Sequence, residues 1–460
     1  MKPTSSSANV ARITSIAAIA AIGGFLFGFD TAVINGAVAA LAGAFHASEL
    51  AIGLTVSSAL VGCAIGAYLA GWFADRYGRT RAMKSAAILF VVSGILSAAA
   101  FGLVDLSLWR FFGGIAIGAA SVIAPAYIAE ISPARLRGRL GSLQQLAIVI
   151  GIFAALLGDY GIARAAGSAS APWFFGLPAW RWMFFTEVIP AVVYGVGAFF
   201  IPESPRWLVA KGRDQEAKVI LDALGEAPGK LDEIKQSIDR EKPSRLSDLR
   251  GPMLGLLPIV WVGLAVAVLQ QLVGINVIFY YSSVLWQSVG FSESDALGVT
   301  VITSVTNIVT TFIAIAAVDR FGRRPLLLAG SAGMTLALGA MAILFARAAV
   351  DAKGVHFDRT SGLAALGFAN LFVFCFGFSW GPVVWVLLGE MFSNQIRGQA
   401  LGVATTAQWL ANFLVSVSFP ALQKIGLGFA YGLYAFAAAV SFVVVLKTVK
   451  ETRGKSLEEM

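Results

Sequence analysis

The chain has 460 residues, of which 58% are hydrophobic and only 13% are charged. Soluble domains usually carry about 25% charged residues, so this composition leaves too little polar surface for a water-soluble fold. With only two cysteines and two histidines, the chain argues against a disulfide framework, a thiolate metal site or histidine-based catalysis, and hence against an enzyme. The net charge of +8 fits membrane orientation better than nucleic-acid binding.

Twelve windows with few or no charged residues follow one another along the chain. Six of them come first, at 13–29, 50–74, 85–104, 111–129, 140–158 and 188–202. Six more lie at 251–292, 296–318, 325–346, 360–389, 398–423 and 425–446. Each window, with flanking residues where it is short, can cross a bilayer as a helix. The sequence therefore predicts an all-α integral membrane protein with twelve transmembrane helices, six in residues 1–202 and six in residues 251–447.

The segment between the two sets of windows has a different composition. Residues 203–250 hold 20 of the chain's 60 charged residues. Residues 214–224 and 231–239 have the mixed charge and apolar spacing of short amphipathic helices. We predict a small cytoplasmic helical linker domain here; a merely solvated connection is the alternative. Residues 448–460 would form a cytoplasmic tail.

The basic residues predict the orientation. If the N-terminus is inside, the inner segments carry 27 Lys and Arg residues, and the outer segments carry 6. Since Lys and Arg gather in cytoplasmic loops, both termini are expected in the cytoplasm.

An internal repeat divides the chain in the same way. The sequence DRYGR at 75–79 returns as DRFGR at 319–323, and Glu130 and Arg137 return with the same spacing as Glu390 and Arg397. Each copy has the same place relative to its six windows. The repeat predicts two six-helix halves related by an axis along the membrane normal.

Taken in order, the motifs resemble those of the sugar porters of the major facilitator superfamily over essentially the whole chain. They are GGFLFGFD at 23–30, the two DRxGR loops, PESPRWL at 202–208, QQ at 270–271 followed by GIN at 274–276 and YY at 280–281, GPVVW at 381–385, and ETRG at 451–454. Lys450 departs from the proline usual before the last motif. The resemblance implies two bundles that rock around a central sugar site, no cofactor, and a monomer.

Asp30 is the costliest residue in the apolar windows, because an ionisable group near the bilayer centre costs about 2.5–3.5 kcal/mol. Its candidate partner is Arg110, at the start of the fourth window. The resemblance implies that the carboxylate accepts the coupled proton and that the arginine modulates it. A structural ion pair between two helices is the alternative.

A monosaccharide offers hydroxyl groups and apolar ring faces, so its site needs amides and aromatic rings. Interior amides and a tryptophan supply both, and the resemblance implies that seven of them line the sugar pocket. These are Gln145, Gln270, Gln271, Asn276, Asn307, Trp385 and Gln408. Asn412 and Trp380 serve either the site or packing. A break at Gly274 would bring the amides of the seventh window to one side. For each amide, a simple hydrogen bond between helices is the alternative.

Tyr280 and Tyr281 extend the seventh window outward from the amides. We expect an outer gate over the bound sugar, with an interfacial aromatic anchor as the alternative.

Charged residues recur at the expected inner ends of the helices, where they would gain from the helix dipoles. We expect ion pairs between the halves to hold the inner mouth shut. This expected latch comprises Asp75, Arg76, Arg79, Glu130, Arg137, Glu187, Glu203, Arg206, Arg320, Glu390 and Arg397.

The sequence thus predicts a proton-coupled monosaccharide symporter in a bacterial inner membrane. Aliphatic Ile152, beyond Gln145, favours glucose or a related hexose. A facilitative uniporter and a xylose or pentose symporter are the near alternatives, and a non-transporting sugar sensor is a distant one.

Overall fold

The computed structural model describes residues 7–133, 136–226, 229–240, 246–351, 354–356, 359–393 and 396–453. Within them, twelve helical segments are long and apolar enough to cross a membrane, which confirms the predicted count. The first five spans are α1 (Ser7–Ala44), α2 (Glu49–Tyr77), α3 (Arg79–Ala99), α4 (Leu103–Ile131) and α5 (Arg137–Ala166). The sixth joins α6 (Ala179–Thr186) to α7 (Val188–Phe200).

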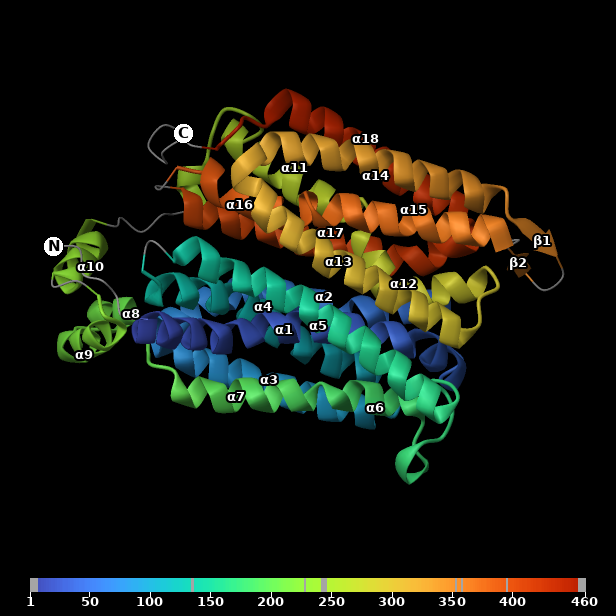
Figure 1. Cartoon of the computed structure of the whole chain (residues 1–460), viewed down its shortest axis with the longest axis horizontal. Coiled ribbons are helices and arrows are strands. Elements are labelled where there is room, and N and C mark those ends of the chain that lie inside the picture. The colour runs from blue at the N-terminus through green and yellow to red at the C-terminus, as the bar shows by residue number, and fades with distance from the viewer. Residues whose placement is uncertain are drawn as a thin grey trace.

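The second set of spans follows the same plan. It consists of α11 (Pro258–Leu272) with α12 (Ile275–Ser288), α13 (Glu293–Phe321), α14 (Arg323–Ala346), α15 (Arg359–Gly377) with α16 (Trp380–Met391), α17 (Arg397–Ile425) and α18 (Leu427–Thr448). Figure 1 shows the two sets as two bundles lying side by side.

Between the bundles in sequence lie α8 (Pro205–Ala210), α9 (Asp214–Leu224), α10 (Lys230–Arg240) and the 3-10 turn 246–249. The helices α8 and α9 share a small hydrophobic core around Trp207 and Leu208, against which Ile234 of α10 packs. The indole of Trp207 also donates a hydrogen bond to the carbonyl of Asp75, 2.9 Å away. The charged segment is therefore a packed helical unit attached to the first bundle, as the amphipathic pattern indicates.

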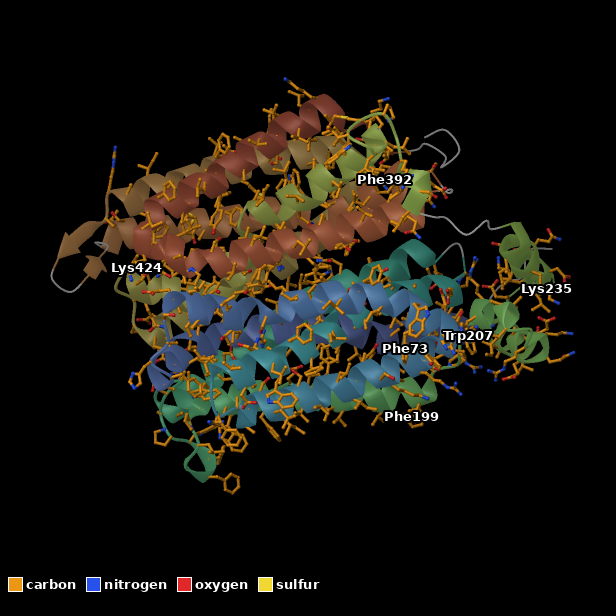
Figure 2. The ribbon with its side chains drawn as sticks, turned by 180° about the vertical axis from the view of Figure 1, so that it is seen from behind. Phe73, Phe199, Trp207, Lys235, Phe392 and Lys424 are labelled. Atoms are coloured by element: carbon orange, nitrogen blue, oxygen red, sulfur yellow. The ribbon has the colours of Figure 1, made fainter. Side chains whose placement is uncertain are left out.

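The unit α8–α10 marks one end of the molecule, the linker end, and the antiparallel strands β1 (Ala349–Asp351) and β2 (Gly354–His356) mark the other, the hairpin end (Figure 1). No sequence pattern predicted these two short strands. Figure 2 shows Trp207 and Lys235 at the linker end and Lys424 at the hairpin end.

Two of the spans are broken where the sequence suggests a break. Gly274 separates α11 from α12 in the left-handed conformation, with φ of 81°, which glycine adopts without steric cost. The tenth span is interrupted between α15 and α16, directly before Gly381 and Pro382. After the second break, the backbone carbonyls of Trp380 and Gly381 accept hydrogen bonds from a side chain of α11.

The two bundles are joined at the hairpin end by a set of contacts that we call the seam. Asn35 of α1 donates to the carbonyl of Phe279 on α12, at 2.9 Å, and its carbonyl accepts from the hydroxyl of Ser283, at 2.6 Å. The amide of Ala169 donates to Glu293, at 2.7 Å. An exposed ion pair of Lys424 with Glu49, at 3.3 Å, completes the seam. Because exposed pairs contribute little, the buried bonds of Asn35 are the main polar link.

A glycine allows α2 and α17 to approach at the seam. A Cβ added at Gly53 would lie 2.6 Å from the carbonyl oxygen of Val417. Overpacking of this kind costs about 1–3 kcal/mol. Gly53→Leu should therefore lower the ratio of closed to open hairpin ends about 5- to 150-fold. Distances between spin labels at positions 49 and 424 would measure the shift.

The matched control is Gly43→Leu on α1, because a Cβ there would meet nothing within 4 Å. An unchanged distance distribution in Gly53→Leu, or an equal change in the control, would contradict this account of the seam.

Candidate functional site

Four of the predicted amides form one continuous hydrogen-bonded network in the second bundle. Asn276 donates to Gln271, at 2.5 Å, and Gln271 donates to the side-chain oxygen of Gln270, at 3.3 Å. Gln408 of α17 donates to the same oxygen, at 2.6 Å. Gln270 is therefore the centre of the network, with α11, α12 and α17 each contributing to it.

Backbone groups next to the break in the tenth span bind the side chain of Gln270. The side-chain amide of Gln270 donates to the carbonyls of Trp380, at 2.7 Å, and Gly381, at 3.2 Å. The ring of Trp380 is fully buried, and its indole donates to the hydroxyl of Ser331. Trp380 thus supplies a backbone acceptor, while its ring packs inside the bundle.

The other predicted sugar residues lie outside this network. Asn307 is buried on α13 and lies close to Gly377, at the end of α15. A Cβ added at Gly377 would be 3.3 Å from the side-chain oxygen of Asn307. Gln145 is half-buried on α5 of the first bundle. Trp385 is 40% exposed on α16. Their role in sugar binding stays a prediction.

Asp30 and Arg110 form an ion pair inside the first bundle, as the sequence predicts. The distance from Nη1 of Arg110 to Oδ1 of Asp30 is 3.1 Å, and the side chains are only 2% and 1% exposed. Arg110 also donates to the carbonyl of Asp30, at 3.4 Å, and its guanidinium lies 5.8 Å from the ring centroid of Phe184. The second oxygen, Oδ2 of Asp30, has no partner among the described residues. The carboxyl therefore keeps one oxygen available for a proton.

Glu187 lies beside this pair, and its prediction as a latch residue is wrong. It sits at the junction of α6 and α7, within the sixth span, and is 1% exposed. It interacts electrostatically with both Asp30 and Arg110. The uncharged window 188–202 begins one residue after it, which suggests a helix end, but 15 residues are too few to cross a bilayer. Extending the span backwards to Ala179 would have placed Glu187 inside it.

Tyr280 is a buried residue of α12, in the second bundle. Its hydroxyl accepts a hydrogen bond from Asn412, at 3.5 Å, and it interacts electrostatically with Asp30 and Arg110. Tyr281 donates to the carbonyl of Ser416, at 2.9 Å, and its ring packs on Phe419. Both tyrosines are buried on α12, and the hydrogen bond of each joins it to α17 of its own bundle. The gate stays a prediction.

The charged residues described at the linker end pair within each bundle, and the pairing between bundles, which is expected while the inner mouth is shut, stays a prediction. Arg79 binds Glu130, at 3.0 Å, and Asp75, at 2.8 Å, and its backbone amide donates to Glu203. All four belong to the first bundle or to the turn that follows it. The DRxGR loop connects neighbouring helices, so its arginine reaches the helix ends of its own bundle first.

The second bundle repeats this arrangement. Arg323 binds Glu390, at 2.7 Å, and its backbone amide donates to Glu451, at 2.9 Å. At the matching turns, Gly78 and Gly322 have φ of 103° and 90° and leave room for the carboxylates of Glu203 and Glu451. The repeat seen in the sequence is thus a repeated charge cluster, one for each bundle.

The remaining latch residues make local contacts or fall outside the description. Arg76 lies over the rings of Trp72 and Tyr77, and Arg320 over the ring of Phe321. Arg206 donates to the hydroxyl of Ser237, and Arg397 to the carbonyl of Phe392. The side chain of Arg137 lies outside the described part of the chain.

The pH dependence of stability can test whether the charge of Glu451 stabilises its cluster. Burial raises the pKa of its carboxyl, but hydrogen bonds from the backbone amides of Arg323, Arg453, Arg324 and Thr452 outweigh burial, so the pKa lies below its usual value. A carboxyl with a lowered pKa stabilises the fold above its unfolded pKa of about 4.3, and this contribution is lost as the pH falls through the folded pKa.

We therefore expect Glu451→Gln to lower the melting temperature at neutral pH. The difference from the unmodified chain should shrink once the pH falls below about 4.3. Glu233→Gln, which removes an exposed pair with Lys230, is the control and should change little at any pH. A difference for Glu451→Gln that is constant with pH would contradict a role for the charge.

Within the described residues, no group of three or more His, Cys, Asp or Glu side chains is placed to hold a metal ion. The site is therefore built from one buried ion pair, a third carboxyl and a chain of amides.

Comparison with known proteins decides the family. The family described as sugar (and other) transporter matches residues 16–460. The chain belongs to this sugar transporter family.

Relatives of this sugar transporter span its whole length. It is 58% identical over 462 residues to the glucose transport protein of Synechocystis, which covers all of the chain and 99% of the relative. It is 38% identical over 488 residues to the D-xylose-proton symporter of Escherichia coli K12, covering 98% and 96%. A solved structure of the Escherichia coli xylose transporter XylE, described as partially occluded inward open, matches with a TM-score of 0.84 and 36% identity over 97% of this chain and all of that one.

The sugar transporter also holds site residues that the sequence prediction missed. Asn35 and Ser283 form the buried part of the seam, and Asp159 is a buried carboxyl on α5. Asp159 directly follows the uncharged window 140–158, so it looks like a residue beyond a helix end. The helix continues to Ala166, which places Asp159 within the span.

Proposed function

We propose that this sugar transporter is a proton-coupled symporter that moves glucose or a related hexose across a bacterial inner membrane by alternating access. The observation that carries the proposal is the buried pair of Asp30 and Arg110, in which Oδ2 of Asp30 has no partner among the described residues. The glucose transport protein and the xylose-proton symporter among the relatives support the sugar and the proton, respectively.

The coupling step begins at the free oxygen of Asp30. A proton that binds Oδ2 removes the negative charge facing Arg110, so the attraction between α1 and α4 weakens. Glu187 is then the remaining carboxylate near Arg110. Because α1 also carries Asn35 of the seam, a change in the position of α1 would reach the contact between the bundles. Proton binding and closure of the hairpin end are thereby linked.

The amide network serves the sugar. Gln270, Gln271, Asn276 and Gln408 offer both donors and acceptors, which is what a ring of hydroxyl groups requires. The four amides bind one another, whereas Oε1 of Gln408 has no partner among the described residues, so a sugar must replace some of these bonds without leaving an amide unpaired. Gln145, Asn307 and Trp385 would complete the pocket from other helices.

The orientation and organisation are part of the proposal. The linker end faces the cytoplasm, as do both termini, because the segments that the sequence assigns to the inner side carry 27 Lys and Arg residues and those assigned to the outer side carry 6. Residues 1–202 and 251–447 act as the two moving bundles, residues 203–250 as the cytoplasmic unit, and residues 448–460 as a tail. The transporter works as a monomer.

Proteoliposomes test the proposal directly. Adding glucose outside should make the external medium more alkaline, because protons enter with the sugar. A protonophore should abolish this signal. Sugar uptake without any change in external pH would favour a facilitative uniporter in which Asp30 is structural.

Competition of labelled glucose uptake by unlabelled hexoses and pentoses would rank the sugars by affinity. Stronger competition by xylose than by hexoses would favour the pentose alternative.

A further inference from the structure

Three acidic side chains among the described residues are more than nine-tenths buried: Asp30, Asp159 and Glu187. Two of them share the charge of Arg110, as described above. Asp159, on α5, has no such partner. Its oxygen Oδ2 accepts a hydrogen bond from the backbone amide of Gly36, at 3.1 Å, and its oxygen Oδ1 has no partner in the described part of the chain.

Charged groups on the helices packed against α5 are engaged elsewhere. On α5 itself, Arg164 donates to the hydroxyl of Tyr160, at 2.9 Å. On α6, Arg181 donates to the carbonyl of Ala98, and on α13, Glu293 accepts from the amide of Ala169. On α4 and α1, Arg110 and Asp30 bind each other. None of these contacts supplies Asp159 with a countercharge.

The position of Asp159 links it to the seam. Its hydrogen-bond donor, Gly36, directly follows Asn35, whose side chain and carbonyl bind α12 of the other bundle. The same short stretch of α1 is therefore held from one side by Asp159 and from the other by Phe279 and Ser283. Any movement that parts α1 from α12 acts next to the carboxyl of Asp159.

A carboxylate removed from water without a countercharge is far costlier than the neutral acid. The neutral acid keeps a carbonyl oxygen that accepts the bond from Gly36, and its proton occupies the free Oδ1. When the hairpin end opens and water reaches the carboxyl, the ionised form becomes favourable again.

We propose that Asp159 is a second proton-binding site, which holds a proton while the hairpin end is closed and releases it when that end opens. The proton enters and leaves on the same side, so it does not drive accumulation. Instead, it makes closure of the hairpin end easier as the solution on that side becomes more acidic. The inference rests on the alternating access of the proposed function and adds a group that the coupling by Asp30 does not use.

Infrared spectroscopy of the full-length chain in lipid tests the proposal without any transport. In the variant Asp30→Asn with Glu187→Gln and Arg110→Gln, which leaves no buried arginine charge unpaired, Asp159 is the remaining deeply buried acid among the described residues. At neutral pH this variant should show the carbonyl band of a neutral carboxylic acid in an apolar setting. The band should disappear when Asp159→Asn is added, and it should persist when the exposed Asp295→Asn is added instead.

Adding Gly53→Leu to the same background tests the link to closure, because the larger side chain props the seam apart. The neutral-acid band should then be lost at neutral pH and return at acidic pH. The proposal is overturned if the starting variant lacks the band, if Asp159→Asn leaves it unchanged, or if it persists at neutral pH with Gly53→Leu although spin labels show the hairpin end open. None of these outcomes depends on sugar or proton transport, so they are separate from a failure of the proposed function.

Discussion

Asp30→Asn is expected to abolish uphill accumulation of sugar while leaving exchange of sugar across the membrane largely intact. The amide has nearly the same shape as the carboxyl but cannot take up and release a proton, so the sugar gradient is no longer tied to the proton gradient. Removing one member of a buried ion pair usually costs about 3–5 kcal/mol, because the other charge is left unpaired. Here Glu187 remains close enough to Arg110 to compensate part of that charge, so we expect a folded protein.

Energised vesicles with labelled glucose would measure both quantities. The accumulation ratio in Asp30→Asn should fall to about one, whereas counterflow from preloaded vesicles should stay close to that of the unmodified transporter. Asp222→Asn, an exposed substitution of the same kind on α9, should leave both unchanged. Full uphill uptake in Asp30→Asn would refute the coupling role and leave the ion pair as a structural link between α1 and α4.

Gln270→Ala is expected to lower transport efficiency for glucose about 10- to 100-fold, because Gln270 is the centre of the amide network. The substitution removes the acceptor for Gln271 and Gln408 and the donor to the carbonyl of Trp380. Each lost hydrogen bond contributes about 0.5–1.5 kcal/mol, and buried groups left without a partner cost about 1–3 kcal/mol. A single buried group left without its partner, at about 1.4–2.8 kcal/mol, corresponds to the stated range, since about 1.4 kcal/mol changes an equilibrium constant tenfold.

Initial rates over a range of glucose concentrations would separate binding from turnover. The loss should appear chiefly as a higher half-saturating concentration, since the amides act on the bound sugar. Gln287→Ala, on α12 beyond the network, is the matched control and should stay within about twofold of the unmodified chain. A normal half-saturating concentration in Gln270→Ala would show that the network packs the second bundle without binding sugar.

Local sequence patterns were sufficient for the membrane spans. The apolar windows gave the spans because a bilayer admits only helices of a certain length. Gly274 could be read as a break because only glycine readily adopts the left-handed conformation that separates α11 from α12. The pair of Asp30 and Arg110 was also within reach, since a buried charge needs a partner and few were available.

The ends of the uncharged windows predicted less well how deep a neighbouring charged residue lies in the membrane. Both Glu187 and Asp159 border an uncharged window, and a charged residue there is easily taken for a helix end. The structure places both inside spans, where they are among the most buried acids described. Their depth depends on how far each helix continues past the charge, and that is set by packing against neighbouring helices.

The partners of the charged motifs needed the tertiary structure. The repeated DRxGR loops suggested charges that lock the two halves together, but Arg79 and Arg323 bind carboxylates of their own bundles. The links between bundles come instead from Asn35, Phe279 and Ser283, which carry no distinctive motif. Sequence alone determined the helices, their repeat and the chemistry available inside them, because hydrophobic length and residue type are local properties. Only the folded chain decided which of those groups meet, because hydrogen bonds and ion pairs depend on how residues distant in sequence are brought within about 3 Å of one another.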